Sequence, residues 1–215
     1  MHHHHARERA GTIGICSLSA DQPLSRQHLP RYCSVGIHPW NAAERTLSEA
    51  LARMEGVCSD PHCIAIGEVG LDRLRGPALA EQERVLRAQL DLAQVQDLPV
   101  ILHDVRSTSD LLRMRKDYPR QQWILHGFRG TPELAEQCLG KGFHISLGPG
   151  LLKSAPRGAS LGAVIPPDRL FLESDDSDRD IREMYNAVAS WTGMQVSALL
   201  AQIEDNFHKV FGVQP

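Results

Sequence analysis

Short apolar runs alternate with amphipathic segments along most of the chain. The runs are rich in β-branched residues and bounded by polar ones, which is typical of buried strands. Seven of them predict strands, at residues 12–18, 32–37, 63–67, 100–102, 123–125, 143–147 and 170–172. The segments between them place apolar residues three and four positions apart, a spacing that predicts helices packed on a core.

The helix signals are clearest in the middle of the chain. Residues 78–97 carry the longest helical pattern, and Pro99 ends it before the next strand. Thr131 and Pro132 predict a helix start, because threonine caps a helix and proline suits the first helical position. Further helices are expected at residues 47–54, 107–114, 131–139, 178–190 and 195–209.

Repeated strand–helix units predict parallel strands joined by right-handed crossovers. We therefore expect an α/β fold of the TIM (β/α)₈ type, which needs eight strands. The chain offers seven, and no gap inside it is wide enough for another. The missing strand belongs before residue 6, so strand 1 is either truncated or absent. No Gly/Ser-rich or Pro-rich linker interrupts the pattern, which predicts a single domain over residues 1–215.

Composition narrows the class of protein. The 215 residues are 42% hydrophobic and 23% charged, as in an average globular domain. A net charge of −3 gives no support to stable nucleic-acid binding by bulk charge. No apolar run is long enough to span a membrane, and no signal-peptide pattern opens the chain. The five cysteines share no repeated spacing, and Cys58 to Cys63 lacks the second half of a zinc motif, so we expect a reducing cytoplasm.

Ionisable residues recur where apolar runs end. Glu68, His103 and His126 each follow such a run directly, and Asp175 comes shortly after the last one. Each could serve a local role, Glu68 as a helix cap and Asp175 within an acidic stretch. In a parallel barrel, however, all strand carboxyl ends meet at one rim, so these four side chains should share a cavity. Imidazoles with carboxylates suit Mg²⁺, Mn²⁺ or Zn²⁺, and a bridging carboxylate would let the site hold one or two such ions.

Five ordered sequence blocks make the pattern more specific. They are GIHPW at 36–40, IGEVGLD at 66–72, LPVILH at 98–103, ILHGFRG at 124–130 and FLESD at 171–175. Together they resemble the signature blocks of the TatD family of metal-dependent hydrolases, in the amidohydrolase-like superfamily of TIM barrels. The resemblance implies a divalent-metal phosphodiesterase, typically a DNase with 3′ exonuclease character. It further implies that Glu68 bridges two metals, that His103 and His126 bind the second, and that Asp175 binds the first and takes the proton of the attacking water.

The beginning of the chain departs from this family pattern. The family opens with a strand ending in His-x-His, whereas here Met1 is followed by four histidines. Two interpretations stay open: the run is an affinity-tag remnant on a truncated chain, or His2 and His4 (alternatively His3 and His5) are the metal-binding pair. Without the pair, the first metal would lose two ligands, and a mononuclear or inactive site would follow.

The remaining candidates lie around the expected metals. His38 and Asp72 are expected to orient ligands, and Arg129, with Arg106, to pair with a phosphate. Trp40 stands where the family usually offers a second histidine, and Ser174 replaces its usual threonine. We expect the substrate to be DNA ends or a small phosphodiester, and the oligomeric state is left open. Two alternatives remain: hydrolysis of an amide or lactone by the same site, and a catalytically impaired scaffold that lacks the first strand.

Overall fold

In the computed structural model, which describes residues 2–3, 13–21, 29–42 and 47–213, eight parallel strands form one sheet. The strands follow one another in sequence order, and among the described residues no ladder joins the last strand back to the first. They are β1 (His2–His3), β2 (Ile15–Ser19), β3 (Cys33–Gly36), β4 (Cys63–Asp72), β5 (Val100–Val105), β6 (Trp123–Leu125), β7 (Phe143–Leu147) and β8 (Leu170–Leu172).

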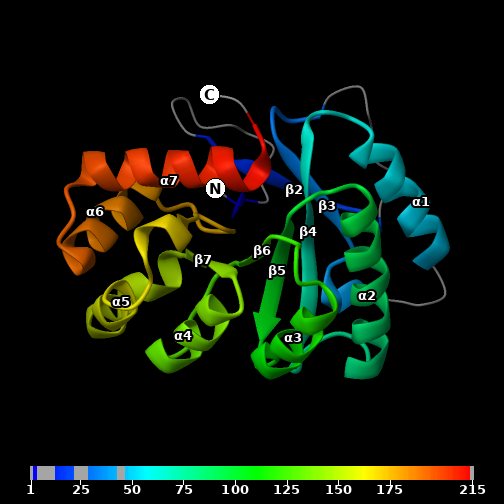
Figure 1. Ribbon diagram of the computed structural model, residues 1–215, viewed down its shortest axis with the longest axis horizontal. Helices are drawn as coiled ribbons and strands as arrows, with labels where there is room; N and C mark the ends of the chain where they lie inside the picture. Colours follow the sequence, from blue (N-terminus) through cyan, green and yellow to red (C-terminus); the bar gives the residue numbers. More distant parts are fainter. Residues whose placement is uncertain (1, 4–12, 22–28, 43–46, 214–215) are drawn as a thin grey trace.

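Helices surround this sheet. They are α1 (Leu47–Cys58), α2 (Leu79–Val95), α3 (Thr108–Met114), α4 (Pro132–Gly140), α5 (Ala155–Gly162), α6 (Ile181–Thr192) and α7 (Val196–Phe211). Figure 1 shows the strands in the middle, with α1 and α2 to one side, α5 and α6 to the other, and α7 across the top. The parallel α/β architecture predicted from the strand–helix repeat is therefore confirmed. No helix in the described part of the chain has the length and apolar character needed to cross a membrane.

The first position in the sheet is occupied by part of the histidine run. His2 and His3 form β1, with His2 in register with Ile15 and His3 with Cys16 of β2. His4 and His5 lie outside the described residues. The strand expected before residue 6 is therefore present, with His2 and His3 as its described residues.

Two helical segments show where the sequence signals succeeded and failed. Helix α4 begins at Pro132, and the hydroxyl of Thr131 accepts a hydrogen bond from the Leu134 amide at 3.3 Å, which confirms the predicted cap. Helix α5 was not predicted, because its eight residues include proline and glycine and too few apolar positions to show a period. Short 3₁₀ helices, among them Pro39–Asn41 (η2), also carried no signal.

Two strands extend beyond their apolar runs. Strand β4 continues through Glu68 to Asp72 with all ten residues buried, and β5 continues through His103 to Val105. The prediction that Glu68 and His103 come just after their strands was wrong, since both lie within them. The polar side chains broke the apolar pattern without ending the backbone pairing. His103 is consequently held in the ladder between β4 and β5, and the Glu68 amide donates a hydrogen bond to the Ser17 hydroxyl of β2.

Candidate metal centre

An irregularity in β4 positions Glu68. Ile66 is in register with Val100 of β5 and Val69 with Leu102, so β4 has one extra residue in this interval. A bulge of this kind bends a strand and changes the direction of the side chains within it. The ladder then resumes with Gly70 opposite His103. A Cβ atom at Gly70 would collide with the His103 backbone, so only glycine allows this close pairing.

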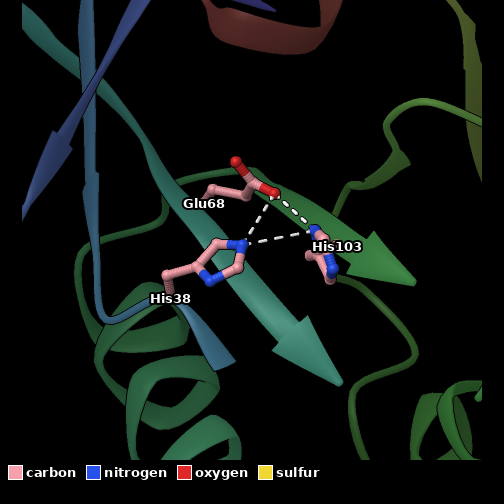
Figure 2. Close-up of side chains that lie close together, drawn as sticks. All are labelled: His38, Glu68 and His103. Carbon is pink, nitrogen blue, oxygen red and sulfur yellow. Dashed lines mark hydrogen bonds and ion pairs between the residues drawn. The ribbon is translucent and has the colours of Figure 1, made fainter. Parts of the chain in front are cut away.

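Three imidazoles converge on one oxygen of Glu68, a residue only 5% exposed. The Oε1 atom lies 2.6 Å from His103 Nδ1, 2.6 Å from His126 Nε2 and 3.2 Å from His38 Nε2. Figure 2 shows His38, Glu68 and His103 pointing toward one another, His38 from the segment just after β3, Glu68 from β4 and His103 from β5. Residues distant in sequence therefore form one compact group of nitrogen and oxygen donors.

The donors fit a divalent cation. His103 Nδ1 lies 3.3 Å from His38 Nε2 and 3.4 Å from His126 Nε2, so ring nitrogens face each other around the carboxylate oxygen. Such an arrangement requires a proton or a cation among the nitrogens, because their lone pairs would otherwise repel. The metal-ligating atoms of His38, Glu68 and His103 lie within 4.8 Å of one another. Nitrogen and oxygen ligands without thiolates favour zinc, manganese, magnesium or iron.

Asp72 contacts the other side of the His103 ring. Its Oδ2 atom lies 3.4 Å from His103 Nε2 and accepts a 2.6 Å hydrogen bond from the indole N–H of Trp40. Its Oδ1 atom accepts hydrogen bonds from the amides of Leu74 and Arg75. Burial raises the pKa of Asp72, but the hydrogen bonds from Trp40, Leu74 and His103 outweigh it and lower the pKa below its usual value. Asp72 thus remains a carboxylate and holds His103 in orientation.

A second group of donors adjoins the first through His126. The metal-ligating atoms of His126, Glu173 and Asp175 also lie within 4.8 Å of one another. Glu173 is fully buried, and its carboxylate accepts hydrogen bonds from the Gly127 amide and the Ser146 hydroxyl, both at 2.6 Å. Asp175 is half-buried and has a left-handed backbone with φ of 50°. Glu173 is therefore fixed in the interior, whereas Asp175 can reach water at the rim.

The charge state of His126 follows from its neighbours. Burial by itself lowers the pKa of this imidazole, but the carboxylates of Glu68 and Glu173 raise it well above its ordinary value. The ring lies between these two carboxylates, with Nε2 toward Glu68 and Nδ1 toward Glu173. This pocket attracts positive charge strongly, whether a proton or a metal ion carries it.

Helix α2 holds the strand end that carries His38. The buried Gln89 side chain accepts a 2.7 Å hydrogen bond from the Ile37 amide and donates one to the Ile37 carbonyl. His38 follows immediately, and its Nδ1 atom accepts a hydrogen bond from the Trp40 amide at the start of η2. Both interactions restrict the backbone and ring of His38 so that Nε2 faces Glu68.

The structure places the candidates from the sequence as follows. Glu68, His103 and His126 meet directly, and Asp175 joins them through His126. His38, expected to orient a ligand, instead lies within the first group of donors, and Asp72 lies behind His103. Arg129 is exposed, with its guanidinium over Gly150. For the proposed His2 and His4 pair, only the backbone of His2 is described, and His4 lies outside the described residues.

Sequence reasoning missed Glu173 as a site residue. It directly follows β8, just as His126 directly follows β6. Like the other candidates, Glu173 is an ionisable residue directly after a predicted strand. The acidic residues that follow it, however, favoured the interpretation of a solvated segment. Its burial and its two hydrogen bonds distinguish it from Asp176 and Asp178, which are exposed.

Three of the cysteines, Cys33, Cys58 and Cys63, lie close together. Cys58 and Cys63 have their sulfur atoms 3.9 Å apart, and all five cysteines are reduced. Hydrogen bonding among Cys33, Cys58 and Cys63 lowers the pKa of the Cys63 thiol and raises the pKa of the other two. In the part of the chain that the structure describes, neither group of candidate metal ligands includes a cysteine.

The chain is similar to known proteins of one family. Residues 19–212 match the model of the family described as TatD related DNase. The chain is 33% identical over 67% of its length to the uncharacterized metal-dependent hydrolase YabD of Bacillus subtilis, and 37% identical over 75% of its length to the 3′-5′ ssDNA/RNA exonuclease TatD of Erwinia tasmaniensis. These matches span 58% and 65% of the relatives' own lengths, so the chain covers less than two thirds of them.

A further sequence match and a solved structure extend the similarity over most of the chain. The exonuclease TatD of Musicola paradisiaca is 31% identical over 94% of this chain and 88% of its own length. The crystal structure of YjjV, a TatD homolog from Escherichia coli, superposes with a TM-score of 0.77 at 25% identity. It covers 94% of this chain and 86% of the other.

Proposed function

Because the chain belongs to the TatD-related DNase family, we propose that it is a divalent-metal-dependent nuclease that hydrolyses phosphodiester bonds at DNA ends. The observation that carries the proposal is the convergence of His38, His103 and His126 on Glu68 Oε1. Relatives named as exonucleases acting on single-stranded DNA and RNA support the substrate class. We further propose that residues 1–215 form one domain and that the enzyme acts in the cytoplasm.

We assign the metal ligands from the two groups of donors. His103, His126 and Asp175 would hold the metal together with Glu68, the ligand shared where two ions bind, and with His2 and His4. The ion is Mg²⁺, Mn²⁺ or Zn²⁺, with one or two bound. Bound there, such an ion supplies Lewis acidity and lowers the pKa of water toward neutrality.

Residues of the chain accept the proton, orient the ligands and bind the substrate phosphate. Asp175, half-buried at the rim, takes the proton of the attacking water as general base. Asp72 and Glu173 keep the rings of His103 and His126 oriented, since each carboxylate lies beside the ring nitrogen turned away from Glu68. Arg129, exposed over Gly150, pairs with a phosphate of the substrate.

The proposal is tested with a single-stranded oligonucleotide labelled at its 5′ end. We expect shortening from the 3′ end with Mg²⁺ or Mn²⁺, loss of activity with EDTA, and recovery when metal is added back. The Glu68→Ala variant should lose at least a hundredfold in rate, whereas Glu136→Ala, on the exposed surface of α4, should match the wild type. Activity that survives EDTA or Glu68→Ala would refute the metal mechanism.

The same preparation separates the alternatives. Elemental analysis of untagged protein should give at least one divalent metal per chain, and less would favour a scaffold without catalysis. Hydrolysis of amides or lactones by a metal-loaded protein that leaves oligonucleotides intact would place the chemistry in another substrate class.

A further inference from the structure

Trp40 is the most exposed aromatic side chain beside the candidate metal centre. Tryptophan is usually well buried, yet 44% of this residue's surface is exposed. Its ring centroid lies 4.6 Å from that of His38 and 6.0 Å from that of His103, two members of the donor group around Glu68. A large apolar surface thus meets solvent directly next to the place where a phosphodiester would be bound.

The indole is fixed by its polar edge. Its N–H donates to Asp72 Oδ2 at 2.6 Å, and the same carboxylate contacts His103 Nε2. The orientation of the ring is therefore tied to the orientation of a candidate metal ligand. An aromatic surface held in this way loses little conformational entropy when a ligand stacks on it.

Arg75 adds a positive charge to the same surface. Its guanidinium carbon lies 4.7 Å from the centre of the Trp40 ring, within the range of a cation–π interaction. Arg75 is exposed, and its backbone amide donates to Asp72 Oδ1. Asp72 thus holds the indole with one oxygen and the segment carrying the guanidinium with the other.

The segment between β4 and α2 is held against η2. Gln82, buried at the start of α2, donates to the carbonyls of Asp72, Arg75 and Pro77. Gly76 has a left-handed φ of 86°, and a Cβ atom there would lie 2.6 Å from the Pro39 carbonyl oxygen. The two segments can therefore pack this closely only with glycine at position 76.

We propose that Trp40 and Arg75 form a stacking platform for a nucleobase that flanks the phosphodiester to be cleaved. This inference rests on the proposed nuclease function and names the binding subsite that the function leaves open. Every base has a π-face, so a base that stacks on the indole, or on the guanidinium that lies over it, is bound with little sequence preference. The platform selects an unpaired base, because a base within a duplex is already stacked on its neighbours.

A comparison of intact and abasic substrates tests the platform. The oligonucleotides have the same length, and one lacks the bases on both sides of the bond to be cleaved. We expect Trp40→Leu to raise KM for the intact substrate about tenfold and to leave KM for the abasic one nearly unchanged. Trp40→Phe, which keeps a ring but loses the indole N–H, should show a smaller rise in KM. Arg75→Gln should raise KM severalfold.

Tryptophan fluorescence provides a readout that does not depend on cleavage. Of the three tryptophans, Trp123 is fully buried and Trp191 packs on Gly158 of α5. A deoxynucleoside monophosphate, added with Mn²⁺, should quench the wild type and the control Trp191→Phe, but deoxyribose 5-phosphate should not. Trp40→Leu should show no such quenching.

The outcomes separate the platform from the nuclease function. Metal-dependent cleavage with equal KM for intact and abasic substrates, and no quenching by the nucleotide, overturns the platform and keeps the function. Quenching that depends on Trp40 without cleavage of any oligonucleotide keeps the platform and overturns the function. A fall in kcat for Trp40→Phe on both substrates, with KM unchanged, would show instead that the indole only orients Asp72.

Discussion

Glu173 Oε1 lies 3.6 Å from His126 Nδ1, on the side of the imidazole that faces away from Glu68. The Gly127 amide and the Ser146 hydroxyl hold this carboxylate in place. His126 is therefore oriented by a buried anion that is itself fixed by the backbone of one segment and a side chain of another. The orientation of this candidate ligand depends on a negative charge behind it.

Replacing that charge should weaken metal binding. In Glu173→Gln the side chain keeps its shape but loses its charge, so His126 becomes a poorer ligand. We expect Mn²⁺ affinity to fall about 10–100-fold, as for other residues that support metal ligands. Titration calorimetry measures it, with Glu136→Gln on the exposed face of α4 as the matched control. Equal affinities in the two variants would contradict this role.

Gln89 should be required for both stability and the position of His38. The Gln89→Leu variant leaves the buried amide and carbonyl of Ile37 without their side-chain hydrogen bonds. We expect the free energy of unfolding to fall by about 1–3 kcal/mol. Urea denaturation checks this against Gln94→Leu, which lies on the exposed surface of α2. A loss no larger than that of the control would show that the hydrogen bonds between Gln89 and Ile37 do not stabilise the fold.

His144 should make the protein less stable in mild acid. Burial lowers its pKa from 6.5 to about 4, and the structure gives its Nδ1 atom no hydrogen bond among the described residues. Between these two values the unfolded chain binds a proton that the folded chain does not, so stability falls as the pH falls.

The His144→Phe variant isolates this effect. Between about pH 7 and pH 4.5, the wild type should lose roughly 2 kcal/mol more unfolding free energy than the variant. Denaturant unfolding at the two pH values measures the difference. The exposed His62, replaced in His62→Gln, serves as control and should follow the wild type. Parallel losses in wild type and His144→Phe would show that His144 does not titrate in this range.

The start of α4 offers a test of local stability alone. Thr131→Ala removes the hydroxyl that accepts a hydrogen bond from the Leu134 amide. This should lower the free energy of unfolding by about 1 kcal/mol. Thr131→Ser keeps the hydroxyl and should recover most of that loss. Metal affinity should be unchanged in both, because Thr131 contacts none of the candidate ligands. A serine variant as unstable as the alanine variant would argue against capping.

The strand–helix repeat was sufficient to predict the architecture, because parallel strands buried on both faces leave uninterrupted apolar runs. All seven predicted strands exist, and the strand placed before residue 6 exists as His2–His3. The apolar pattern did not predict the full length of β4, because this buried strand contains the charged residues Glu68 and Asp72, which interrupt the apolar run.

The sequence could predict only those site residues that directly or shortly follow a predicted strand. That rule identified Glu68, His103 and His126, although two of them lie within longer strands. His38 also directly follows a predicted strand, 32–37, but it was expected only to orient a ligand, because the direction of its ring depends on Gln89 and on the turn at Pro39. The role of Trp40 depends on a contact between η2 and Asp72 at the end of β4, which sequence spacing does not encode.

The extra residue in β4 reconciles two demands that no single amino acid can meet. Opposite Ile101 there is no room for a side chain, since a Cβ atom at Gly67 would lie 2.7 Å from the Ile101 Cβ atom. At the same level of the strand the histidines need a carboxylate, which Glu68 provides. Because β4 has two residues where a regular ladder has one, Gly67 can pack against Ile101 while Glu68 presents its carboxylate to the histidines. A one-residue deletion between Ile66 and Val69 would straighten the strand and force the protein to give up either its packing or its carboxylate.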